Sequence, residues 1–230
     1  MRLDKFLCAA TQLTRRDAHR CIKNGLVAVD GQVVQDPGLQ IESERVTLDD
    51  EVIRLPEPVY LMLHKPAGYV CANTDGLHPT VLDLLPRDLH PTEPLQIVGR
   101  LDLDTTGLLL LTTDGQWNHR VTAPNSRCDK VYWVELAEPI TQESVSELEQ
   151  GVLLRSEEKP TLPCQIEILT PNQVRIRLRE GRYHQVKRMF AAVGNHVTQL
   201  HRVSIGSLTL DPSLQPGEFR HLTQDEVRSL

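Results

Sequence analysis

The sequence predicts an α+β protein with a small N-terminal domain, residues 1–57, and a larger second domain, residues 58–230. Three observations support this class. A short helix, a basic helix and a hairpin pattern fill the first part of the chain. Pro56 and Pro58 then stiffen the chain where an acidic stretch ends. Beyond them, helices do not alternate regularly with strands, which disfavours a doubly wound parallel sheet and favours a mixed or antiparallel sheet flanked by helices.

Two helices and a hairpin account for the start of the N-terminal domain. Apolar residues recur at helical spacing from Leu3 to Ala10 and predict a short helix. A second helix is delimited by Thr14, a good N-cap, and by Asn24–Gly25, a good stop. Asp30–Gly31 then predicts the turn of a hairpin. The second helix carries its apolar residues on one face and its cations on the other: Arg15, Arg16, Arg20 and Lys23.

This basic module points to a phosphate-rich partner, although the chain has a net charge of −6 and is therefore no generic nucleic-acid binder. A basic helix face that is merely solvated is the alternative. The order of helix, basic helix and hairpin resembles the S4 RNA-binding domain over roughly residues 1–45. The resemblance implies that six cations contact RNA: Arg2, Lys5, Arg15, Arg16, Arg20 and Lys23.

The second domain contains several recognisable elements. Residues 59–72, "VYLMLHKPAGYVCA", predict a strand, a turn and a second strand. Leu108–Leu111 predicts a buried strand, residues 130–137 a further strand, and residues 140–151 an acidic helix that ends at Gly151.

A basic segment follows the acidic helix. Apolar and cationic residues alternate over 174–179, as in a strand with one apolar face. Glu180–Gly181 turns the chain into a helix whose apolar residues run from Val186 to Val193, with His184, Lys187 and Arg188 on its opposite side. Residues 197–200 predict the next strand.

An acidic turn at the start of the buried strand is the main candidate for chemistry. Asp102 and Asp104 lie between Gly99 and Gly107, next to the leucine run. A turn or capping role is the simple explanation for such aspartates. Glycines on both sides allow another backbone or a substrate to approach closely, and the strand would hold a carboxylate rigidly. The nucleotide-binding, zinc-protease and serine-hydrolase motifs are absent from the sequence, and its histidines have no paired spacing, so a metal site is not expected.

Three segments resemble, in order, the motifs of the RsuA/RluA-type pseudouridine synthases. They are "HKPAGYVCA", "GRLDLDTTGLLLLTTDG" and "EGRYHQVKRMF". The resemblance implies that Asp102 is the nucleophile, that Tyr132 is the active-site tyrosine, and that Lys187 is the basic residue paired with the aspartate. Asp104 then shapes the loop. No cofactor is expected, because isomerisation of uridine needs neither redox chemistry nor an energy source.

The remaining expectations concern the substrate. Leu200 matches an apolar wall of the uracil pocket, and Arg100, Arg182 and Arg188 are expected to bind the RNA substrate. The resemblance implies conversion of uridine 516 of 16S ribosomal RNA, as naked RNA or in a small-subunit assembly intermediate, by a monomer. A large-subunit ribosomal RNA enzyme of the same family is an alternative. The sequence does not distinguish attack on the sugar, attack on the base ring, or proton abstraction through a glycal.

Two other classes of function remain open at this stage. An RNA-binding assembly protein would share the basic helices without needing Asp102, and a hydrolase would use Asp102 and Asp104 as an acid–base pair. Five widely spaced cysteines without a CxxC motif predict reduced thiols in the cytoplasm. The sequence shows no apolar run long enough for a membrane helix, and a secretory signal is not expected.

Overall fold

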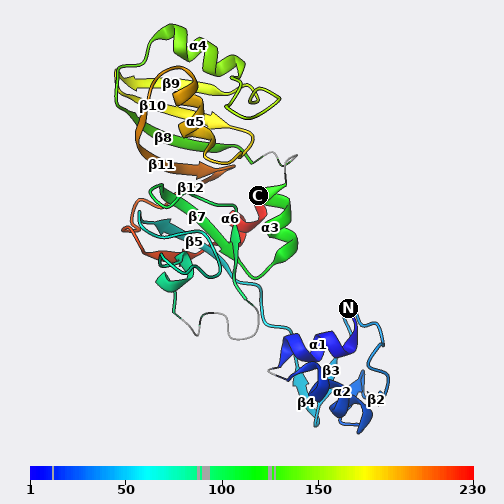
Figure 1. The fold of residues 1–230 in the computed structure, drawn as a ribbon. Coiled ribbons are helices and arrows are strands. Elements are labelled where there is room, and N and C mark those ends of the chain that lie inside the picture. The colour runs from blue at the N-terminus through cyan, green and yellow to red at the C-terminus, as the bar shows by residue number, and fades with distance from the viewer. Residues whose placement is uncertain (12, 87–88, 90–93, 124–125, 127) are drawn as a thin grey trace. The chain divides into compact units, whose positions relative to one another are not determined.

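The computed structural model describes residues 1–11, 13–86, 89, 94–123, 126 and 128–230. The chain forms two compact units, one of which holds Met1–Pro58 and the other Val59–Leu89 and Leu95–Leu230. The first unit contains a four-stranded sheet and the second a nine-stranded sheet, so the predicted α+β class is confirmed (Figure 1). Within the described ranges, no helix is both long enough and apolar enough to cross a membrane.

The N-terminal unit packs α1 (Leu3–Ala10) and α2 (Arg15–Lys23) against a sheet with the order β2-β1-β3-β4. The Thr14 hydroxyl caps α2 as predicted, accepting a hydrogen bond of 3.2 Å from the Asp17 amide. Asp30 and Gly31 have φ values of 49° and 79°, which suit a tight hairpin turn. The strands of this sheet are β1 (Val27–Val29), β2 (Gln32–Val33), β3 (Val46–Leu48) and β4 (Glu51–Ile53).

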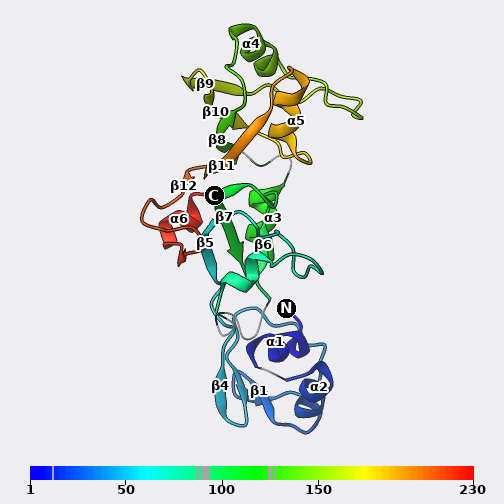
Figure 2. The same cartoon turned by 60° about the vertical axis from the view of Figure 1, so that its left-hand side comes forward.

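The second unit is built on one mixed sheet. Its main order is β13-β5-β7-β11-β8-β10-β9, with β6 added to β7 and β12 added to β11. Among the described strands only β7 and β11 pair in parallel, as Figures 1 and 2 allow the reader to follow. The strands are β5 (Tyr60–Lys65), β6 (Gln96–Val98), β7 (Thr106–Thr112), β8 (Lys130–Leu136), β9 (Gln165–Thr170), β10 (Gln173–Leu178), β11 (Val197–Ile205), β12 (Leu208–Thr209) and β13 (Phe219–His221).

The leucine run in β7 is buried on both faces of the sheet. Leu108 and Leu110 pack into a core that includes α3 (Gly115–Thr122), while Leu109 and Leu111 pack into a second core on the other face. All four side chains are fully buried. A strand covered on both sides has no solvent-facing positions to alternate, which explains the uninterrupted leucines. The loop that carries Asp102 therefore leads into the most buried strand of the domain.

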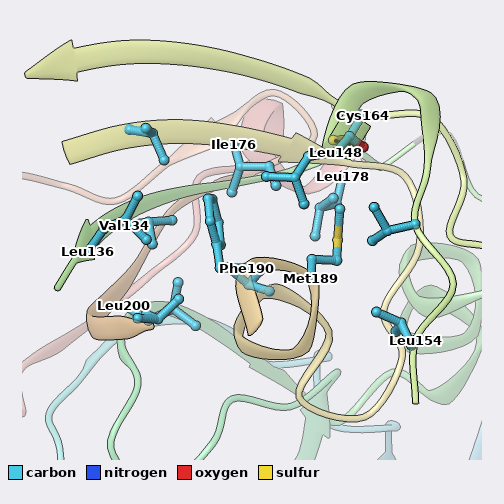
Figure 3. Close-up of a cluster of buried hydrophobic side chains, with 14 residues drawn as sticks. Val134, Leu136, Leu148, Leu154, Cys164, Ile176, Leu178, Met189, Phe190 and Leu200 are labelled. Atoms are coloured by element: carbon cyan, nitrogen blue, oxygen red, sulfur yellow. Dashed lines mark hydrogen bonds between the residues drawn. The ribbon is translucent and has the colours of Figure 1, made fainter. Parts of the chain in front are cut away.

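The other half of the sheet is covered by α4 (Gln142–Gln150) and α5 (Gln185–Ala192). Figure 3 shows Met189 and Phe190 of α5 directed at the apolar side chains of the neighbouring strands, including Ile176 of β10. These helix residues are fully buried. This packing fixes α5, and therefore the polar residues at its start, relative to the sheet. The short elements η1 (Val81–Leu84) and α6 (Gln224–Arg228) complete the domain.

One predicted strand is wrong. After β5, Val70 forms only an isolated bridge to Thr80 instead of the expected second strand of a hairpin. Pro66 has no amide hydrogen to donate, and the Gly68 amide donates to the Leu103 carbonyl. The segment after β5 is thus attached to the loop of Asp102 and not to β5.

Candidate active site

The loop between β6 and β7 carries Asp102. Gly99 at its start has a φ of 73°, a conformation that favours glycine. The Thr105 amide donates to the Asp102 carbonyl at 3.1 Å, which closes a turn directly before β7. The Asp102 side chain is 23% exposed. The aspartate is therefore held by a defined turn and remains reachable from solvent.

A buried lysine, Lys65, anchors this loop to the end of β5. Lys65, the last residue of β5, is completely buried, and its Nζ donates to the carbonyls of Pro66, Leu103 and Thr105 at 3.0, 3.3 and 2.8 Å. Burial lowers the pKa of Lys65. Lys65 was not among the residues expected at the site, although a lysine at the end of an apolar run, where "KPAGY" begins, is a usable signal. Lys65 connects the first motif to the second.

Replacing Lys65 with methionine is expected to destabilise the domain by about 2–4 kcal/mol, because buried carbonyls lose their donor. Urea unfolding of the full chain measures this loss. Activity should fall as well, since the Asp102 loop loses its anchor. Lys5→Met, at an exposed lysine, is the control and should leave the unfolding midpoint unchanged. A Lys65→Met protein as stable as the parent would show that the contacts of Lys65 with the Leu103 and Thr105 carbonyls do not hold the loop.

The Asp102 carboxylate faces two basic side chains of the "EGRYHQVKRMF" segment. Lys187 Nζ lies 3.3 Å from Asp102 Oδ2, and His184 Nε2 lies 3.4 Å from Oδ1. Lys187 also contacts Asp104 Oδ1 at 2.5 Å. Burial raises the pKa of Asp104, but the hydrogen bond and charge of Lys187 outweigh it, so that pKa is lowered. The structure thus places Lys187 beside Asp102, as expected, and bridges it to Asp104.

His184 is a site residue that was not expected from the sequence. It is the N-cap of α5 and has φ 46° and ψ 36°, a left-handed conformation that is uncommon outside glycine. The ring of Tyr183 stacks on it, with centroids 3.9 Å apart and planes 18° apart. Its position beside Lys187 in the third motif was the available signal. Strained backbone of this kind is found where a side chain must be aimed.

A cavity of about 500 Å³ opens beside Asp102. Tyr132 of β8, Leu200 of β11 and the exposed Arg100 line it together with Asp102. This volume lies within the usual range for small-molecule sites. The structure therefore brings together four of the residues proposed from sequence, with Lys187 contacting the aspartate from α5.

Arg182 and Arg188 have a different environment from the one expected. Arg182 lines the cavity, but its guanidinium donates to Glu157, Glu180 and the carbonyls of Lys159 and Pro160. Arg188 donates to Glu157 and to the carbonyls of Tyr183 and Arg155. Internal acceptors thus engage both arginines, and their contact with the substrate stays a prediction. They join residues 155–160 to the start of α5.

Some of the N-terminal cations are organised by a buried acid. Asp4 is 1% exposed, and its carboxylate contacts Arg2 at 2.9 Å, Arg15 at 3.5 Å and His19 at 2.8 Å. The hydrogen bonds from Arg2 lower the pKa of Asp4 despite its burial. Arg20 pairs with Asp17 at 2.7 Å. Lys5, Arg16 and Lys23 are exposed, and within the described ranges they form no ion pair.

The family model "RNA pseudouridylate synthase" matches residues 59–192, and the S4 domain model matches residues 1–52. A ribosomal small subunit pseudouridine synthase A of Vibrio cholerae is 48% identical over 100% of this chain and 99% of its own length. The protein of that name in Escherichia coli K12 is 47% identical over the whole of both chains. A crystal structure of a pseudouridylate synthase matches with a TM-score of 0.73 and 44% identity, over 100% of this chain and 99% of that one.

Proposed function

The chain belongs to the RNA pseudouridylate synthase family, and on this premise we propose that it converts uridine 516 of 16S ribosomal RNA to pseudouridine with Asp102 as the nucleophile. One observation carries the assignment of Asp102. Its carboxylate lies at a cavity that also holds Tyr132, with a cation beside one oxygen and a histidine beside the other. We further propose that residues 1–57 bind RNA and that residues 58–230 carry the catalysis.

The proposed reaction moves the base without losing it. The bond between uracil N1 and ribose C1′ breaks, the base turns, and C5 bonds to C1′ before its proton leaves. Asp102 attacks the sugar or the base ring, or removes a sugar proton, and the positively charged Nζ of Lys187 lies 3.3 Å from its carboxylate. Tyr132 stacks on the base, and its hydroxyl serves proton transfer from C5.

The substrate uridine must leave its stack to reach Asp102, which costs a few kcal/mol. Arg100, exposed at the cavity, holds a backbone phosphate or fills the gap left by the base. Leu200, almost completely buried, forms an apolar wall against the uracil ring. Each role follows from the position of the residue around the cavity.

The choice of a small-subunit substrate rests on the names of the relatives that match the full chain. We propose that a monomer acts on naked 16S RNA or on an assembly intermediate. The test is to incubate the protein with 16S RNA, 23S RNA and small-subunit intermediates, and to map pseudouridine by carbodiimide modification and primer extension. The expected result is one new pseudouridine, at uridine 516 of the 16S RNA. Modification of 23S RNA instead, or binding without modification, would overturn this proposal.

The basic helix α2 is expected to contribute to RNA binding through its positive charge. Arg16→Ala combined with Arg20→Ala should weaken RNA binding and reduce the slope of log Kd against log salt by about one to two, because each phosphate contact releases a counterion. Filter binding at several salt concentrations measures the slope. Arg228→Ala removes an exposed cation from α6 and should leave the slope unchanged. An unaltered slope in the double variant would remove this helix from the RNA interface.

A further inference from the structure

Two buried polar atoms at the cavity lack a partner. Among the side chains that the structure describes, only Thr105 Oγ1 and Arg202 Nη2 are buried without a hydrogen bond. Both residues line the cavity that holds Asp102. An unsatisfied buried donor is costly, and it is costlier when it carries charge. Native proteins rarely retain such a group unless a water, an ion, a ligand or a reaction uses it.

Arg202 is held rigidly by its other nitrogens. It is 3% exposed, its Nε donates to the Leu108 carbonyl at 2.7 Å, and its Nη1 lies 3.5 Å from the Arg100 carbonyl. Its backbone pairs with Tyr132 on β8 and with Gly107 on β7. The guanidinium is therefore fixed against both ends of the Asp102 loop, and one NH₂ group has no internal acceptor.

The cavity around Arg202 is positively charged. Within the described residues no carboxylate lies within ion-pair distance of Arg202, whereas Asp102 is paired by Lys187 and His184. Lys130 also lines the cavity, and its burial and the charge of Arg202 lower its pKa. The cavity is thus lined by the Asp102 carboxylate, which is paired with Lys187, and by the constrained guanidinium of Arg202 on β11, which has no counterion among the described residues.

The reaction places negative charge on the base. When the C1′–N1 bond breaks, its electron pair stays with uracil and spreads to the O2 and O4 carbonyl oxygens. C1′ then bonds to an Asp102 oxygen, or the sugar loses its C2′ proton. Attack of Asp102 on C6 instead sends the C5=C6 electrons towards O4. After C5 has bonded to C1′, C5 releases its proton and N1 takes one up, so that the base is neutral again. Every route therefore passes through a state with charge on a carbonyl oxygen.

We propose that Arg202, through its unpartnered Nη2, stabilises the negative charge on a uracil carbonyl oxygen while the base is detached or attacked. Fixed donors aimed at developing charge are among the strongest catalytic devices, because no reorganisation is needed during the reaction. Arginine suits this role because it stays protonated in a dry site. The proposal rests on the proposed function and adds a catalytic residue to it.

The test compares two leaving bases under single-turnover conditions with saturating enzyme. RNA carries either uridine or 5-fluorouridine at the target position, and consumption of that nucleoside, including any covalent adduct, is followed by digestion and chromatography. Fluorine withdraws electrons and stabilises the anionic base, so this substrate depends less on the enzyme for charge stabilisation. Arg202→Gln should slow uridine consumption by about 10²–10³-fold, the usual cost of one such donor. Its effect on 5-fluorouridine should be at least tenfold smaller.

Two further variants separate catalysis from structure. Arg220→Gln removes another partly buried arginine of the same domain, one that pairs with Asp211 and Glu226. Arg220→Gln should change the rates of consumption of uridine and of 5-fluorouridine by the same factor. Arg202→Lys keeps a positive charge, so its rates should fall less, but the fall should again be larger for uridine than for 5-fluorouridine. It serves as the test variant if Arg202→Gln does not fold.

The outcomes are distinguishable from failure of the proposed function. Equal losses on the two substrates would assign Arg202 a purely structural role and overturn the inference, as would an unchanged rate on uridine. If the unmodified protein converts neither substrate, or if Asp102→Asn stays active, the proposed function itself fails. A loss confined mainly to uridine supports the inference.

Discussion

Replacing Asp102 with asparagine is expected to reduce turnover by at least about 10³-fold, the scale seen when a nucleophile is removed. Asparagine has nearly the same shape but lacks the ionised oxygen that attacks or removes a proton. Lys187 would keep its contact with Asp104, so α5 would remain in place. RNA affinity should stay within about threefold, because the substitution removes no contact with a backbone phosphate. Single-turnover kinetics and filter binding measure the two quantities.

Asp104→Asn is the matched control for this variant. Asp104 contacts the same lysine from the same loop, but its side chain is 71% exposed. Its loss should cost less than about tenfold in rate, through a less constrained Lys187. If Asp104→Asn were the inactive variant and Asp102→Asn the active one, the assignment of the nucleophile would be reversed.

Replacing Gly107 with alanine should be the most damaging structural change. Gly107 has a φ of 107°, and a Cβ atom there would lie 2.3 Å from the Arg202 carbonyl oxygen and 2.6 Å from the Arg202 nitrogen. Both contacts are with backbone, which cannot rotate away. Backbone strain and overpacking together should lower the free energy of unfolding by about 2–6 kcal/mol. The damage falls where β7 and β11 pair, so activity should fall as well.

Urea unfolding monitored by tryptophan fluorescence tests this expectation, since Trp117 packs in the core that contains Leu108. Gly76→Ala is the control, because its added Cβ would meet nothing within 4 Å. It should unfold at the parent urea concentration. A Gly107→Ala protein as stable as the parent would show that β7 and β11 can move apart at little cost in free energy, which would contradict their close packing at Gly107.

Elements with strong local signals could be predicted from the sequence. The spacing of apolar residues identified α1 and α5, the Thr14 cap marked the start of α2, and the leucine run marked β7. These features depend on residues close together in the chain. The second strand predicted after β5 failed because a long-range bond, from the Gly68 amide to Leu103, replaced a local hairpin.

The candidate site was predictable only in part, for a similar reason. Motif resemblance named Asp102, Tyr132 and Lys187, but no local pattern shows that Lys65 reaches two carbonyls of the Asp102 loop, those of Leu103 and Thr105. The backbone of His184 takes a left-handed conformation that composition does not reveal.

The number of cationic residues in a motif also does not show which of them are free to bind a substrate. A cationic residue in a motif near a site suggests substrate binding, as for Arg182, but the sequence does not show which acceptors such a residue already has. The Arg182 guanidinium donates to Glu157 and Glu180, which lie 25 and 2 residues away in sequence. Only the folded arrangement separates such an arginine from Arg202, whose Nη2 has no internal acceptor among the described residues.

The most direct test of the central claim is a mass balance on RNA labelled with tritium at uridine C5. An isomerase that uses Asp102 should release one tritium for each pseudouridine formed, leave no free uracil, and release none in the Asp102→Asn form. Free uracil in place of pseudouridine, or undiminished tritium release from Asp102→Asn, would contradict the account.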